Sequence, residues 1–78
     1  MVTATMNNKY DWGEAVRVIT SADSKFLPGN CGSICGMRVA DRPDIAEKFS
    51  VEIGEIIYIV EFSDGKSLEV PESFLSEM

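Results

Sequence analysis

Cys31 and Cys35 are the side chains of this chain best suited to covalent chemistry, and they stand four residues apart. The chain has no histidine, so the usual base that activates a nucleophile is missing. On a straight strand the two Cα atoms would lie about 13 Å apart, whereas a disulfide needs less than about 7 Å. A metal site would need further ligands. We therefore expect reduced thiols, no metal, no cofactor and no catalytic residue; an enzyme would depend on a reactive thiol at one of these two positions.

Charge gives the second chemical signal. The net charge is −6, and it is uneven: residues 1–40 hold four basic and three acidic residues, whereas residues 41–78 hold three basic and ten acidic ones. Such a surface repels phosphate backbones and attracts basic partners. We expect a basic protein partner and no nucleic acid, although an acidic surface also serves solubility alone. The acids expected to steer association are Glu47, Glu52, Glu55, Glu61 and Glu69.

Apolar side chains would supply the binding energy of such an interface. The aromatic residues Tyr58 and Phe62 fall in a well-patterned strand and are expected in the core, so an aromatic cage for a cation is the weaker interpretation. Trp12 is the aromatic residue most expected to be exposed. The predicted partner-binding residues are Trp12, Phe26, Ile57, Ile59, Glu61 and Glu69.

The clearest predicted element that positions these residues is a hairpin near the C-terminal end. Residues 55–62 and 66–70 are rich in residues that favour strands, and Asp64-Gly65 between them predicts a type I′ turn. Ile56, Tyr58, Val60 and Phe62 share one strand face, and Ile57, Ile59 and Glu61 share the other. Because both faces are apolar, Ile57 and Ile59 are either covered by another segment or form a contact surface.

Two further strands precede the hairpin. Residues 12–19 alternate with Val16 and Val18 inward and Arg17 outward. Residues 20–30 form a polar loop in which Phe26 either caps the core or contacts a partner. Residues 32–39 form the second strand, where two glycines predict a bend or a close approach of another strand. There Ile34 is expected inward, with Cys35, Met37 and Val39 on the opposite face.

Residues 41–54 and the C-terminal end are less regular. The segment 44–49 has the length for one and a half helical turns after Pro43, but we interpret 41–54 as an extended insertion that ends in a short strand. Residues 71–78 begin with proline, which suits the first position of a helix, and predict a single helical turn. Phe74 or Leu75 is expected to fill the bottom of the barrel.

In order along the chain, these segments resemble the small SH3-like barrels. The resemblance rests on Val16-Arg-Val18, Gly32-Ser-Ile34, Tyr58-x-Val-x-Phe62 and Pro71-x-x-x-Leu75. It implies an all-β fold: a small SH3-like, partly open barrel of about five antiparallel strands with a short C-terminal helical turn. Such a barrel hosts many unrelated functions.

Within that group the chain most resembles a family of bacterial immunity proteins from polymorphic-toxin systems. The matching segments are Val16-Arg-Val-Ile19, Gly32-Ser-Ile-Cys-Gly36 and Val70-Pro-Glu-x-x-Leu75, whereas residues 41–54 depart from the family pattern. The resemblance implies direct inhibition of a protein toxin by binding, without chemistry.

Size and hydropathy complete the sequence-based expectations. We predict a disordered tail over residues 1–9, a single domain over 10–78, a cytoplasmic location and no membrane contact, since no apolar run is long enough to cross a bilayer. The alternative function is a homodimer in which Ile57, Ile59 and Met37 meet across a two-fold axis and a cleft between subunits binds a small ligand.

Overall fold

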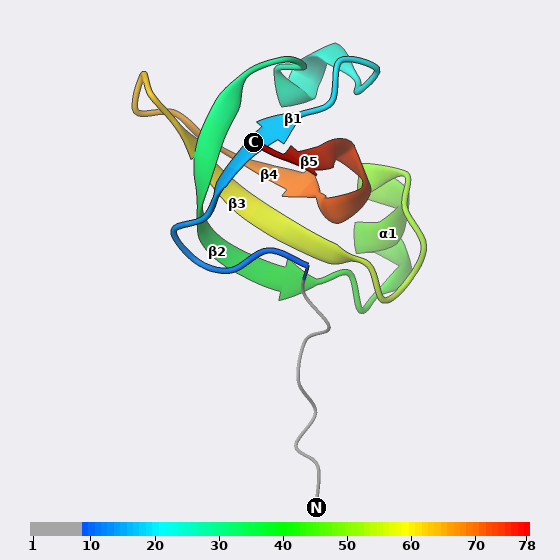
Figure 1. The fold of residues 1–78 in the computed structure, drawn as a ribbon. Helices are drawn as coiled ribbons and strands as arrows, with labels where there is room; N and C mark the ends of the chain where they lie inside the picture. The colour runs from blue at the N-terminus through cyan, green and yellow to red at the C-terminus, as the bar shows by residue number, and fades with distance from the viewer. Residues whose placement is uncertain (1–8) are drawn as a thin grey trace, which may run out of the picture.

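The computed structural model describes residues 9–78, so residues 1–8 of the predicted tail lie outside the described part. Five strands form one antiparallel sheet in the order β4-β3-β2-β1-β5 (Figure 1). The sheet curls into a barrel that stays open, because β4 pairs with β3 alone and β5 with β1 alone. The all-β, partly open SH3-like barrel is thereby confirmed. The elements are β1 (Ala15–Val18), η1 (Ser24–Phe26), β2 (Cys31–Val39), α1 (Pro43–Phe49), β3 (Ile56–Phe62), β4 (Ser67–Pro71), η2 (Glu72–Phe74) and β5 (Leu75–Glu77).

The core lies on the concave face of the sheet. In β1 buried and exposed residues alternate, with Val16 and Val18 inward and Arg17 outward as predicted. Ile34 lies opposite Val60, and Tyr58 lies opposite Val70, so these four side chains also point inward. Burying such residues removes apolar surface from water, which is the main force that holds a small domain together.

A β-bulge at Cys35 changes the faces predicted for β2. The β2–β3 register runs from Ile34 opposite Val60 directly to Gly36 opposite Ile59, so Cys35 is the extra residue. One extra residue reverses the alternation beyond it. Met37 and Val39 therefore lie opposite Tyr58 and Ile56, on the same face as Ile34. The prediction that they oppose Ile34 is wrong, although the predicted irregularity of this strand is confirmed.

The turn between β3 and β4 also differs from its prediction. Gly65 has φ 87°, but Asp64 is not among the non-glycine residues with positive φ, so the turn is not type I′. The Gly65 N–H donates to the Phe62 carbonyl at 3.0 Å, and the Phe62 N–H donates to the Lys66 carbonyl at 2.8 Å. This is a type I turn followed by a glycine bulge, the common three-residue hairpin loop. Asp64 contributes by accepting the Lys66 N–H at 3.0 Å.

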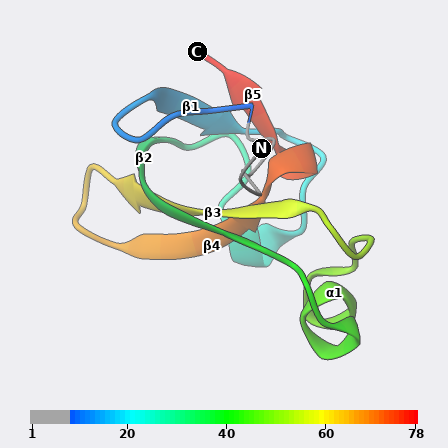
Figure 2. The same cartoon turned by 90° about the horizontal axis from the view of Figure 1, so that it is seen from below.

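The prediction of an extended insertion over residues 41–54 is wrong, because its first half is the helix α1. Pro43 occupies the first turn, where its missing N–H costs nothing. Ser50 ends the helix in a left-handed conformation with φ 57°. Ala46 and Phe49 are the buried residues of α1. Figure 2 shows the helix beyond the end of the sheet where β2 finishes and β3 begins.

Three phenylalanines from three short elements pack together. Phe26 of η1 lies between Phe49 of α1 and Phe74 of η2, with ring centroids 6.4 Å and 5.4 Å away. Phe26 is only 4% exposed. The prediction that this loop residue caps the core is confirmed, and Leu75 beside the cluster in sequence is buried as well.

The two ends of the described chain meet on the barrel. The first strand begins at Ala15, three residues later than predicted, and Tyr10 before it is fully buried. The predicted C-terminal helical turn is present as η2, but residues Leu75–Glu77 then form β5 against β1. The Tyr10 hydroxyl donates to the Leu75 carbonyl at 3.2 Å, which fastens the segment before β1 to the start of β5.

Candidate functional site

The structure separates the six predicted partner-binding residues into exposed and buried ones. Trp12 is 72% exposed, in the segment just before β1. Phe26 and Ile57 belong to the core, Ile57 with no exposed surface at all. The prediction that these two side chains anchor a partner is therefore wrong. The apolar outer face of β3 was expected either to be covered by another segment or to form a contact surface. Ile57 is covered.

The other three residues lie together on the outer face of the β3–β4 hairpin. Ile59 is directly opposite Glu69, and Glu61 is the next residue of β3 on that face. Glu69 is not a free charge, because its Oε2 lies 2.6 Å from Arg38 Nε. Glu61 is exposed and Ile59 half-buried. The outer face therefore offers one unpaired acid and a modest apolar area.

The dimer interface proposed from the sequence does not fit this geometry. Ile57 is covered, and the bulge turns Met37 to the face opposite Ile59. A single two-fold contact cannot use both faces of one sheet. An interface formed by Ile57, Ile59 and Met37 together is therefore incompatible with the fold.

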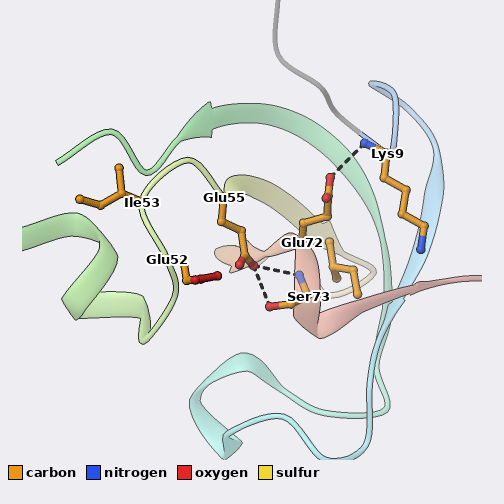
Figure 3. Close-up of a pocket in the computed structure, with 7 residues that line it drawn as sticks. Lys9, Glu52, Ile53, Glu55, Glu72 and Ser73 are labelled. Atoms are coloured by element: carbon orange, nitrogen blue, oxygen red, sulfur yellow. Dashed lines mark hydrogen bonds between the residues drawn. The ribbon is translucent and has the colours of Figure 1, made fainter. Parts of the chain in front are cut away.

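A different surface gathers the acidic residues: a depression of about 420 Å³ between the loop that precedes β3 and the η2 turn. We call it the acidic depression (Figure 3). Glu52 and Glu55 come from the loop, Glu72 from η2, and Lys9 stands at the far side. The lining residues are Lys9, Glu52, Ile53, Glu55, Glu72, Ser73 and Leu75.

Glu55 ties the loop to η2. Its Oε2 accepts the Ser73 N–H at 3.0 Å and the Ser73 hydroxyl at 2.7 Å (Figure 3). Two hydrogen bonds to one carboxylate oxygen fix its position, while the other oxygen has no hydrogen bond to the described residues. The loop itself is held by backbone hydrogen bonds, since the Val51 N–H donates to the Ala46 carbonyl of α1 at 2.9 Å and the Gly54 N–H donates to the Ala40 carbonyl at 2.8 Å.

Glu72 is fixed by a second network that reaches the core. Its Oε2 accepts the Tyr58 hydroxyl at 2.6 Å and the Lys9 N–H at 2.9 Å. The Tyr58 oxygen in turn accepts the Tyr10 N–H at 3.1 Å, and the two tyrosine rings meet edge to face at 5.5 Å. Burial, with the hydrogen bond to Glu72 as a second cause, raises the pKa of Tyr58 to about 12.

We expect Tyr58→Phe to destabilise the fold by about 1–3 kcal/mol, because the buried Tyr10 N–H and the Glu72 carboxylate each lose one hydrogen bond. The pH dependence should change as well. The folded chain holds the phenol proton to a higher pKa than the unfolded chain, so this stabilisation is complete below about pH 10 and is lost as pH rises toward 12.

Chemical denaturation of both proteins at pH 8 and at pH 11 measures this effect. The stability difference between wild type and Tyr58→Phe should shrink at pH 11. A difference that stays constant or grows would contradict the assigned role of the phenol. Tyr10→Phe, which removes the bond to the Leu75 carbonyl and leaves the hydrogen bond between Tyr58 and Glu72 in place, serves as the matched control.

Glu52 and Ile53 indicate which kind of ligand the acidic depression could bind. The Glu52 side chain makes no hydrogen bond or ion pair with residues 9–78 and is exposed. Ile53 beside it is 60% exposed, one of the few large apolar side chains on the described surface. Among the described residues no group of three or more metal-ligating side chains could hold a metal ion. The arrangement is suited to binding a cationic side chain next to an apolar contact.

Sequence reasoning found part of this surface. Glu52 and Glu55 were among the predicted steering acids, but Ile53, Glu72 and Ser73 were missed. Ile53 was missed because residues 49–53 alternate like a strand, and this pattern does not predict an exposed isoleucine in a loop. Glu72 joins Glu52 and Glu55 only through the tertiary contact of η2 with the loop.

Both cysteines are free, Cys31 half-buried and Cys35 exposed at the bulge. No helix within the described residues is long and apolar enough to span a membrane. Comparison of the chain with protein-family models, with curated proteins and with solved structures gave no match.

Proposed function

We propose that this domain is a non-enzymatic binding module that recognises a basic protein through its acidic depression, and that it acts as an immunity-type protein by covering a toxin. The observation that carries the proposal is the convergence of Glu52, Glu55 and Glu72 beside the exposed Ile53. The sequence resemblance to immunity proteins at Val16-Arg-Val-Ile19, Gly32-Ser-Ile-Cys-Gly36 and Val70-Pro-Glu-x-x-Leu75 supports the biological role.

Electrostatics give the physical reason. With a net charge of −6, the chain draws a basic partner toward itself before contact, and a concave acidic surface orients it. Glu55 and Glu72 are already ordered by hydrogen bonds, so binding a cation there costs little additional side-chain entropy. Ile53 supplies an apolar contact at the edge.

A binding role also agrees with how the carboxylates are used. Glu55 and Glu72 accept two hydrogen bonds each from the protein itself. Such bonds fix the position of each carboxylate, which suits the recognition of a cationic side chain. The chain offers no histidine to complement them.

The first experiment immobilises the chain and captures proteins from a lysate of the source organism at low and at high salt. We expect one dominant basic protein, released by salt and identified by mass spectrometry. The purified partner then allows rates to be measured with defined variants.

Glu52→Lys is expected to slow association with that partner roughly three- to tenfold at low salt, and the effect should shrink as salt rises. Glu61→Lys is the matched comparison, an exposed glutamate at the opposite end of β3 on the outer face. Surface plasmon resonance gives both rates. If Glu61→Lys slows association and Glu52→Lys does not, the outer face of the hairpin is the binding surface and the proposal for the depression fails.

A further inference from the structure

A second concave surface follows the free edge of β4. This groove of about 230 Å³ is lined by Leu68 and Glu69 of β4 and by four residues of η1 and α1: Lys25, Phe26, Lys48 and Phe49. Successive side chains of a strand point to opposite faces. Because the groove touches both Leu68 and Glu69, it must run along the edge of the strand rather than over either face. We call it the β4 groove.

The edge beside the β4 groove has unused backbone hydrogen-bonding groups. Phe62 and Lys66 form a hydrogen-bonded pair at the hairpin end, and such pairs alternate along an antiparallel ladder. Leu68 and Val70 therefore bond to β3, while Ser67 and Glu69 direct their N–H and C=O groups away from it. These outward groups have no backbone partner among residues 9–78. Pro71 is the next outward position, where its missing N–H leaves no donor unpaired.

The free charge of the β4 groove is positive, in contrast to the chain as a whole. Neither Lys25 nor Lys48 forms an ion pair within the described part of the chain. Their ammonium nitrogens lie 5.2 Å and 5.4 Å from the ring centroids of Phe26 and Phe49. The one carboxylate in the lining, Glu69, is held by Arg38 at 2.6 Å. Two uncompensated lysines therefore border an apolar floor.

We propose that the edge of β4 binds an extended acidic segment of a partner protein as an additional strand. Ser67 and Glu69 would exchange backbone hydrogen bonds with the segment, which is how strand addition gives affinity. An apolar side chain of the segment enters the β4 groove over Leu68, and its carboxylates meet Lys25 and Lys48.

Charge and volume favour a peptide strand over the two other possible occupants of the β4 groove, which are a second copy of the chain and a small molecule. A second copy joined edge to edge would bring the lysines of both chains together and oppose two net charges of −6. A small-molecule site usually has about 300–1,000 Å³, and the β4 groove is smaller. Its size suits individual side chains of a peptide whose backbone lies along the strand.

The test uses fluorescein-labelled heptapeptides of glutamate alternating with leucine, valine or phenylalanine, and matched peptides with lysine in place of glutamate. Fluorescence anisotropy measures affinity, and amide chemical shifts of ¹⁵N-labelled protein locate the contact. We expect an acidic peptide to bind, with shifts concentrated at Ser67 and Glu69, and the lysine peptides to bind more weakly at that edge.

The variant Lys25→Gln/Lys48→Gln should weaken acidic-peptide binding roughly 2- to 25-fold, as expected for the loss of two exposed ion pairs. The matched Arg17→Gln, at an exposed position of β1 away from β4, should leave it unchanged. Absence of Ser67 and Glu69 shifts with every acidic peptide at millimolar concentration overturns the proposal, as does equal affinity for the lysine peptides. Shifts of these amides with protein concentration alone would assign the edge to a second copy and overturn it too. Glu52→Lys does not touch this surface, so the result is independent of the function proposed above.

Discussion

Replacing Ile57 by lysine is expected to leave most of the chain unfolded at 25 °C. The side chain has no exposed surface and belongs to the continuous core, so the ammonium group would be buried without a partner. Burying an unpaired charge costs several kcal/mol, and a domain of this size has a total stability at the low end of about 5–15 kcal/mol. Far-ultraviolet circular dichroism and the loss of amide dispersion in NMR spectra report the outcome.

Two further substitutions distinguish burial from a general intolerance of this strand. Ile57→Val keeps the site apolar and should cost only about 0.5–1.5 kcal/mol. Ile59→Lys, on the same face but half-buried, should be tolerated better, because its ammonium can reach water. A folded, monomeric Ile57→Lys protein would mean that this residue lies at an interface after all.

Gly32→Ala is expected to destabilise the barrel by about 1–3 kcal/mol or more. A Cβ at this position would lie 2.6 Å from the Glu61 carbonyl oxygen and 2.7 Å from Val60 Cγ1. The oxygen belongs to the backbone of β3, and Gly32 itself pairs with both β1 and β3. The central strands would therefore have to separate, because neither backbone can rotate away as a side chain can.

Chemical denaturation measures this loss of stability, and alanine substitutions at Gly36 and Gly13 provide graded controls. At Gly36 the closest atom is the flexible end of Ile59, Cδ1 at 2.9 Å, so alanine should cost less there. At Gly13 nothing lies within 4 Å, but φ is 84°, so the cost of about 1–2 kcal/mol would come from backbone strain alone. Equal stability of Gly32→Ala and wild type would contradict the close approach of β2 and β3.

The fold was predictable where local pattern and tertiary structure agree. Alternating valines in β1 and the dense β3 pattern predict strands because each buries one face. The faces beyond Cys35 were not predictable, since a bulge leaves no mark in hydrophobic alternation except the neighbouring glycines. β5 was missed because Leu75-Ser-Glu has little strand preference of its own; it forms because β1 offers an unpaired edge.

Only the negative charge of the candidate site was predictable from the sequence. The excess of acids after residue 41 indicated a basic partner, but not which carboxylates converge. Glu72 and Glu55 are brought together by the bonds of Ser73 and Tyr58, which join segments far apart in sequence. Phe26 illustrates the opposite error: an aromatic residue in a polar loop looks like a contact residue until the stacking with Phe49 is seen.

The pairing of β1 with β5 has a consequence for how the chain acquires its structure. Strands β2, β3 and β4 follow one another and each pairs with its neighbour in sequence, whereas Val18 must find Leu75 near the other end of the chain. The entropy lost in closing so long a loop is recovered only when the rest of the barrel is already in place. We expect the β1–β5 ladder to form last and to open first, so the amide of Ser76, which lies in a hydrogen-bonded pair with Arg17, should exchange hydrogen faster than those of Tyr58 and Val60.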